Sequence, residues 1–233
     1  MTIEEMHYDF KMKTNKVDSQ QYKGLLVPEI DWVLNEAQEL FVKMILNPGL
    51  KRDLGFELNQ RSIDDIRPLV VHADCTPVVD NIGVLPTDYW RYVRSEVKAD
   101  KGTCTDIGIK VFIRQHDDTF ELSPFDRSNF EWRVVNALFF DGGLKFFDDG
   151  TFTITEFCLD YIKTLTYIHN AANFRGGSYN ALDGSVLSGT VDCELPVQTH
   201  RDIVDIAVLI VTGGLQIPDL QVKMNKIKYE NLK

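Results

Sequence analysis

The residues in this sequence that most resemble metal ligands are His116, Asp117 and Asp118, which stand next to one another. Imidazole and carboxylate groups bind metal ions, but three consecutive residues seldom point at one ion. A His-x-x-x-His or Glu-x-x-His motif on a helix would strengthen the case, and neither accompanies this triplet. We therefore expect a turn with solvated carboxylates here, and we expect no metal ion and no cofactor.

A second group, His72, Asp74 and Cys75, could supply a Cys–His pair for nucleophilic catalysis. No known nucleophile signature surrounds these residues, and the end of a strand followed by a turn explains them as well. The run Gly176-Gly177-Ser178 lacks the lysine and the following helix of a phosphate-binding loop. We expect no catalytic residues. A small hydrolase with two carboxylates across a cleft stays open, because the sequence does not show such a cleft.

The chain of 233 residues has a formal net charge of −10 and a pI near 5.0. An acidic surface repels phosphate backbones, so nucleic-acid binding is disfavoured as the main activity. No secretory leader is recognisable, and we expect all four cysteines (Cys75, Cys104, Cys158 and Cys193) to be reduced thiols. The sequence has no run of 18 apolar residues, so we expect no membrane span.

Helical periodicity marks both ends of the chain. Between Pro28 and Gly49 the apolar residues recur at i, i+3, i+4 and i+7, which predicts an amphipathic helix. Further helices are predicted at 4–13, 62–67, 196–211 and 218–229. Each of the two terminal regions has an apolar face to bury, so we expect them to pack together.

A period of two replaces this pattern from about residue 69. Alternation predicts strands at 107–113 and 130–140. Segments 144–147 and 152–161 are predicted to form a hairpin about Asp148-Asp149-Gly150. The stretch 170–188 is rich in Gly, Asn and Ser and predicts a long loop.

These elements together predict an α+β fold with a central antiparallel β-region. Residues 1–68 and 191–233 are expected to form a discontinuous helical base. Residues 69–190 are expected to form a β-rich domain that carries the long loop at 170–188.

The order of these elements resembles the head–tail adaptor, or ring, proteins of short-tailed phages, in particular the crAss-like phages that infect Bacteroidetes. The landmarks are the segments Ile30–Gln38, Leu85–Trp90, His116–Asp118 with Phe125, Leu159–Ile162, Cys193–Pro196 and His200–Ala207. The resemblance implies a structural protein of the virion that is made in the host cytoplasm and is not an enzyme. It implies a twelvefold homo-oligomeric ring that joins the portal protein to other neck or tail rings. Genomic DNA would pass through its lumen without sequence-specific binding.

Two segments are candidate contact sites in such an assembly. The long loop, with Phe174, Tyr179, Asn180 and Asp183, is a candidate contact between subunits that we expect to order on assembly. The basic C-terminal helix, with Lys223, Lys226, Lys228 and Tyr229, is a candidate contact with the portal or a neighbouring ring. A tail-tube or fibre-attachment protein and a regulatory binding module remain alternative interpretations.

Overall fold

The computed structural model describes residues 1–15, 24–46, 63–116, 127–181 and 183–214. Its mixture of helices and mainly antiparallel strands confirms the predicted α+β fold. The chain divides into a helical unit, Met1–Pro68 with Leu165–Lys233, and a sheet unit, Leu69–Thr164. The first boundary falls where the sequence predicted it. The second lies at 164/165 and not at 190/191, so the segment 165–190 belongs with the helices.

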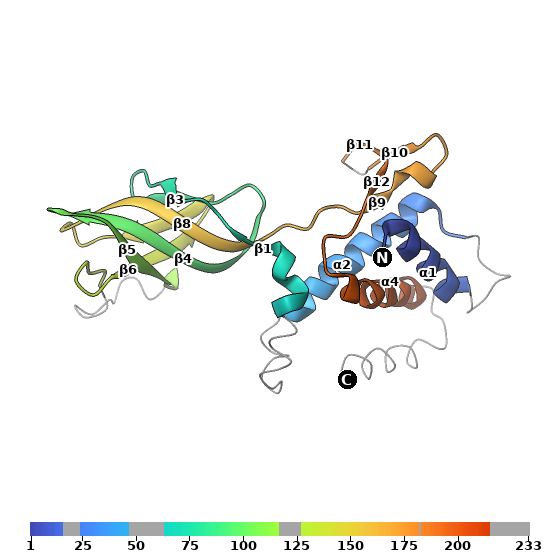
Figure 1. Cartoon of the computed structure of the whole chain (residues 1–233), viewed down its shortest axis with the longest axis horizontal. Coiled ribbons are helices and arrows are strands. Elements are labelled where there is room, and N and C mark those ends of the chain that lie inside the picture. The colour runs from blue at the N-terminus through green and yellow to red at the C-terminus, as the bar shows by residue number, and fades with distance from the viewer. Residues whose placement is uncertain (16–23, 47–62, 117–126, 182, 215–233) are drawn as a thin grey trace, which may run out of the picture. The chain divides into compact units, whose positions relative to one another are not determined.

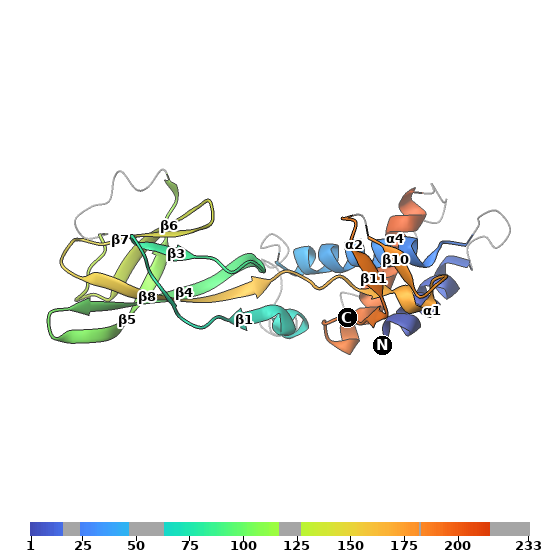
Figure 2. The same ribbon diagram turned by 90° about the horizontal axis from the view of Figure 1, so that it is seen from above.

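Three helices lie side by side in the helical unit (Figures 1 and 2): α1 (Ile3–Asn15), α2 (Val27–Leu46) and α4 (His200–Gly214). Both α1 and α2 contact α4, which confirms that the two terminal regions pack together. Their buried apolar residues follow the helical period: Ile3, Met6 and Phe10 in α1, Ile30, Leu34, Ala37 and Phe41 in α2, and Ile203, Val204 and Ala207 in α4. None of the helices in the described ranges has both the length and the apolar character needed to cross a membrane.

The predicted loop at 170–188 is wrong, because this part of the helical unit contains short regular elements. They are β9 (His169–Asn170), η4 (Ala171–Asn173), β10 (Ser178–Asn180) and β11 (Val186–Ser188). Strand β12 (Thr190–Val191) and η5 (Val197–Thr199) follow before α4. Strands β10 and β11 form an antiparallel hairpin, and β9 pairs with β12. Strands of two or three residues are too short to leave a period of two in the sequence.

The sheet unit is one curled eight-stranded sheet (Figure 1). Its strands are β1 (Val70–His72), β2 (Thr76–Pro77), β3 (Ile82–Val84), β4 (Tyr89–Lys101), β5 (Cys104–Ile113), β6 (Val134–Phe140), β7 (Gly143–Phe147) and β8 (Thr153–Lys163). They lie in the order β1-β8-β4-β5-β6-β7-β3, and β2 also pairs with β8. The β5–β6 pair is parallel, and the other neighbouring strands in this order, like β2 and β8, pair antiparallel.

The predicted hairpin between β7 and β8 is also wrong. Strand β7 pairs with β6 and β3, whereas β8 pairs with β4, β1 and β2. The hairpin that does form joins β6 to β7 through Asp141-Gly142, where Gly142 has a φ of 82°. Asp-Gly between two apolar strands is a strong signal for a two-residue hairpin. It is a stronger signal than the longer Asp148-Asp149-Gly150 turn.

The core of the sheet unit lies on the inner face of the curled sheet. It contains Val97, Ala99, Ile109, Val111, Val135, Ala137, Leu144, Phe146, Phe152, Ile154, Phe157, Leu159 and Tyr161. The rings of Phe146 and Phe157 lie 5.3 Å apart between centroids. A Cβ atom added to Gly83 in β3 would lie 2.7 Å from the Phe157 ring of β8. The edge strand β3 therefore approaches β8 closely, and glycine makes this approach possible.

A disulfide between Cys75 and Cys158 corrects the expectation that all four cysteines are reduced. Cys104 and Cys193 are free, as expected. The bond joins the connection after β1 to β8 across 83 residues of sequence. No spacing pattern marks such a distant pair, so the sequence did not indicate it.

We predict that Cys75→Ser lowers the free energy of unfolding of the oxidised chain by about 2–4 kcal/mol, because the disulfide restricts the unfolded chain. Urea unfolding with and without a thiol reductant measures this effect. Reductant should shift the midpoint of the wild-type chain and leave that of Cys75→Ser unchanged. Cys104→Ser, which removes an exposed free thiol, is the control. An equal response of all three chains to reductant would contradict the prediction.

The raised pKa of Tyr161 makes the stability of the sheet unit depend on pH. Its hydroxyl donates to Asp88 at 2.8 Å. Burial and the neighbouring Asp88 raise the pKa of Tyr161 to about 12. An unfolded tyrosine ionises near pH 10, so the stabilisation is complete below about pH 10 and is lost as the pH rises to about 12. We predict that Tyr161→Phe reduces this alkaline loss of stability, measured by urea unfolding over that range. An unchanged pH profile would contradict the assignment.

Candidate assembly interface

Three polar side chains of α2, Asp31, Asn35 and Gln38, hold the extended segment 166–170 of the helical unit. The Asn35 side chain donates to the Ile168 carbonyl at 2.7 Å and accepts from the Ile168 amide at 2.9 Å. Gln38 donates to a backbone carbonyl at one end of the segment at 3.2 Å, and Asp31 accepts from a backbone amide at the other end at 3.1 Å. Their spacing of i, i+4 and i+7 places all three on one side of α2.

Asp31 is fully buried and is the centre of a network that we call the clasp: Asp31, His7, Asn170 and Tyr179. His7 Nε2 lies 2.6 Å from Asp31 Oδ1, and the Tyr179 hydroxyl donates to Asp31 Oδ2 at 2.7 Å. A buried carboxylate is tolerated only where donors surround it, and these donors come from α1, β9 and β10. The clasp therefore ties the segment that includes the β10–β11 hairpin to both N-terminal helices.

The pKa of Tyr179 supports this assignment of donor and acceptor. Burial raises the pKa of Tyr179, and the adjacent carboxylate of Asp31 raises it further. The phenol therefore keeps its proton at neutral pH and can act only as the donor in this contact.

The four predicted inter-subunit residues of the 170–188 segment divide into two kinds. Phe174 and Tyr179 are half-buried and pack edge to face, with ring centroids 5.8 Å apart. Asn180 and Asp183 are exposed, and Asp183 accepts from the amide and the hydroxyl of Ser185 in the hairpin turn. Because Tyr179 is held by its own chain, the exposed part of the hairpin is what remains for a partner.

The four predicted residues of the C-terminal helix, Lys223, Lys226, Lys228 and Tyr229, lie outside the described residues. Their predicted contact with a portal or a neighbouring ring stays a prediction.

The candidate Cys–His group of the sequence is not a catalytic pair, because His72 is part of an exposed charge cluster. His72 and Arg94 both hydrogen-bond the carboxylate of Asp160. Burial raises the pKa of Asp160, but the hydrogen bonds from His72 and Arg94 outweigh this effect and lower it overall. Cys75 is bonded to Cys158, so it is not a thiol that His72 could activate.

His116, from the candidate metal-ligand triplet, hydrogen-bonds a backbone carbonyl: its Nε2 lies 2.9 Å from the oxygen of Phe139. Asp117 and Asp118 lie outside the described residues. Over the residues that the structure does describe, no three His, Cys, Asp or Glu side chains gather closely enough to hold a metal ion.

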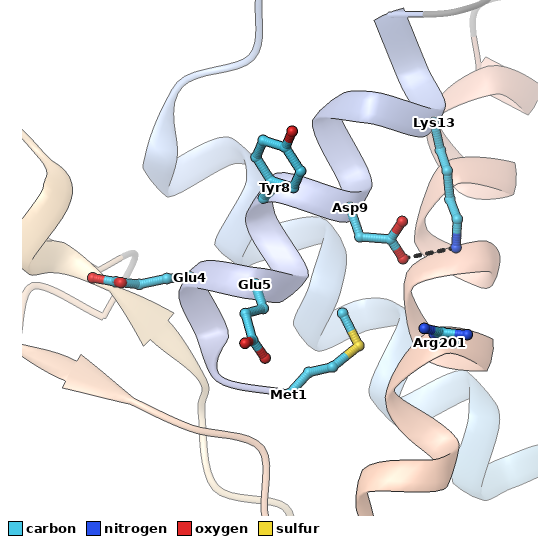
Figure 3. A pocket seen from close by; sticks show the side chains of 7 residues that line it. All are labelled: Met1, Glu4, Glu5, Tyr8, Asp9, Lys13 and Arg201. Atoms are coloured by element: carbon cyan, nitrogen blue, oxygen red, sulfur yellow. Dashed lines mark ion pairs between the residues drawn. The ribbon is translucent and has the colours of Figure 1, made fainter.

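An open groove of about 690 Å³ runs along α1 (Figure 3) and is lined by Met1, Glu4, Glu5, Tyr8, Asp9, Lys13 and Arg201. Lys13 pairs with Asp9 of its own helix and with Asp205 of α4, each at 2.8 Å. Burial lowers the pKa of Lys13, but the hydrogen bonds to these two carboxylates raise it overall. The lysine therefore stays charged and joins α1 to α4.

The side of α2 turned away from the helical core presents apolar side chains to solvent. Trp32, Leu40 and Met44 are 50%, 42% and 39% exposed. The remaining exposed residues on this side are Glu29, Glu36, Glu39 and Lys43. We call these seven residues the outer face of α2. Large apolar side chains exposed together are a common property of protein interfaces.

The sheet unit exposes its own aromatic residue. Trp132 is 81% exposed and lies just before β6, beside Arg133 with its φ of 52°. Its neighbour Glu131 pairs with Lys101 at 2.9 Å, and Lys101 lies over the Phe130 ring. These contacts hold the residues just before the indole, and the ring itself stays in solvent. Tryptophan is among the residues that contribute most to binding at protein interfaces.

No protein-family model matches this chain, and no curated protein matches it.

Proposed function

We propose that this chain is a structural subunit of a phage virion, and that it forms a head–tail connector ring between the portal protein and the tail. The role is assembly and not catalysis. Genomic DNA passes through the lumen of the ring, whose acidic subunits do not hold the phosphate backbone. The order of the sequence landmarks suggested this role.

The observation that carries the proposal is the exposure of large apolar side chains in both units. The outer face of α2 lies in the helical unit, and Trp132 lies in the sheet unit. A closed ring uses heterologous contacts, in which one surface of a subunit meets a different surface of the next. In the proposed ring, the outer face of α2 and the Trp132 side chain are the two different surfaces that meet between neighbouring subunits.

Binding to a recombinant portal ring tests the proposal. We expect the chain to sediment with the portal, with one subunit for each portal subunit. Trp132→Ser should weaken this association, whereas Trp132→Phe, which keeps a large ring, should weaken it less. Unfolding curves of both variants should match that of the wild-type chain, because the side chain is exposed.

Failure to sediment with the portal would contradict the proposed connection. Binding to tail-tube or fibre proteins in the same assay would support the alternative interpretation, in which the chain is a tail-tube or fibre-attachment protein.

A further inference from the structure

We propose that the Cys75–Cys158 disulfide is a redox-sensitive lock on one edge of the sheet unit. Residues 70–78, which we call the strap, contain β1 and β2 and cover one side of β8. Reduction of the disulfide by a dithiol releases the strap, and β8 then becomes an edge strand. This device goes beyond the proposed function and does not depend on it, because it concerns a single chain.

The strap is what makes β8 an interior strand of the sheet. Within the described residues, β1 and β2 both pair antiparallel with β8 alone. Between them the Ala73 amide donates to the Leu159 carbonyl at 2.9 Å, and after β2 the Val78 amide donates to the Thr155 carbonyl at 2.9 Å. The other side of β8 pairs with β4. Release of the strap therefore leaves one row of β8 backbone groups without partners.

The strap has little apolar packing to hold it. None of its nine residues is buried, and four are half-buried: Val71, Ala73, Cys75 and Val78. Just before the strap, Leu69 is fully buried, and after it β3 pairs with β7. The segment is thus anchored at both ends and weakly packed between them, which is the property of segments that open locally while the rest of a domain stays folded.

The side-chain hydrogen bonds between the strap and β8 add little. His72 bonds the carboxylate of Asp160, but the His72 side chain is 70% exposed, so water competes with this contact. The Thr76 hydroxyl donates to the Phe157 carbonyl at 3.5 Å, which is long for a hydrogen bond. The disulfide is therefore the strongest tie between the strap and β8.

The disulfide lies where a reductant can reach it. Phe157 and Leu159 point into the core, so Cys158 between them points to the opposite, outer face of β8. Cys75 and Cys158 are both half-buried. Partly exposed disulfides exchange with thiols, whereas those sealed inside a core are protected.

The exchange needs a dithiol as its reductant. A thiolate of the dithiol attacks one sulfur of the disulfide, and the second thiol of the reductant then displaces this sulfur from the mixed disulfide. Cys75 and Cys158 each end as a thiol, and the dithiol is oxidised to a disulfide. In surroundings where thiols are kept reduced the strap is released, and in oxidising surroundings the disulfide closes it.

Hydrogen exchange followed by mass spectrometry, with and without dithiothreitol, tests the lock on the full chain. In the reduced chain we expect the strap amides, such as those of Ala73 and Val78, to exchange at least about a hundredfold faster than the amides of Val97 and Ile109 in the central strands. In the oxidised chain this difference should shrink at least about tenfold. Removal of the dithiol and addition of oxidised glutathione should restore the slow exchange of the strap.

Low concentrations of urea distinguish local opening from unfolding of the whole sheet unit. Release of the strap exposes little surface, so its exchange in the reduced chain should hardly change with urea, whereas exchange of the central strands should accelerate. Loss of protection in the strap and the central strands together, with the same urea dependence, would overturn the lock. Equal protection of the strap in the oxidised and the reduced chain would overturn it as well.

Two variants serve as controls for the lock. A chain with both Cys75→Ser and Cys158→Ser should exchange like the reduced wild-type chain and should not respond to dithiothreitol. Cys104→Ser, which removes only the exposed free thiol, should respond as the wild-type chain does. If the double variant does not fold, the wild-type chain with and without dithiothreitol still decides the question.

Discussion

Replacing Asp31 by alanine is expected to lower the free energy of unfolding by about 3–5 kcal/mol. The carboxylate is fully buried and accepts hydrogen bonds from the Asn170 amide and the Tyr179 hydroxyl, while His7 Nε2 lies at 2.6 Å. Alanine removes the acceptor and leaves buried polar groups of His7 and Asn170 without this partner, which costs more than the loss of the bonds themselves.

Urea unfolding followed by ellipticity at 222 nm measures the loss, since this signal reports the helices. Tyr179→Phe removes one donor and should cost about 1 kcal/mol. Asp64→Ala is the control, because Asp64 is exposed in the single α-helical turn 63–66 before η2 (Arg67–Leu69). Limited proteolysis should cut Asp31→Ala at the β10–β11 hairpin before the wild-type chain is cut there. A stability loss no larger than that of Asp64→Ala would contradict the clasp.

Replacing Phe157 by alanine is expected to cost about 3–5 kcal/mol in the sheet unit. Phe157 is buried on the inner face of β8, and its ring contacts Phe146 and covers Gly83. Because Gly83 has no side chain, nothing on β3 can move in to fill the space that the ring leaves. The cost includes both the lost burial and the cavity.

The matched control is Phe112→Ala on the same sheet. Phe112 is exposed on β5, with Lys110 over its ring at 4.9 Å. Its removal should cost less than about 1 kcal/mol, since surface substitutions have small effects. Urea unfolding followed by near-ultraviolet circular dichroism measures both variants. Equal losses would contradict the core assigned to the inner face of the curled sheet.

The helices could be predicted from the sequence because their signal is local. The apolar period between Pro28 and Gly49 predicted α2, and Pro196–Val211 predicted most of α4. Both helices bury most of the face that the period indicated, although Leu40 and Met44 of that apolar set are exposed on α2. A pattern within one element is sufficient when the element has one apolar face against one core.

Strand pairing could not be predicted to the same extent, because it depends on residues far apart in sequence. The face of β8 that is buried changes near Thr155, where the register with β4 shifts: Lys98 pairs with Glu156, and Ala99 pairs with Ile154. Strict alternation along β8 would place Phe157 and Ile154 on opposite faces, although both are buried. An extra residue in one strand is invisible without its partner.

The polar residues of α2 that hold segment 166–170 left a signal that apolar periodicity alone misses. Asp31, Asn35 and Gln38 recur at i, i+4 and i+7, the same spacing that marks the buried apolar face of α2. Polar residues at such positions indicate a buried polar contact, but the partner segment 166–170 is more than a hundred residues away. The Cys75–Cys158 disulfide is hidden for the same reason.

The copy number of the protein in purified virions tests the connector role most directly. Quantitative mass spectrometry would compare it with the portal protein of the same particles. The connector role predicts the protein in virions at one copy for each portal subunit. A clear multiple of the portal would indicate a tail-tube or fibre-linked part. Absence from virions would contradict the proposed structural role.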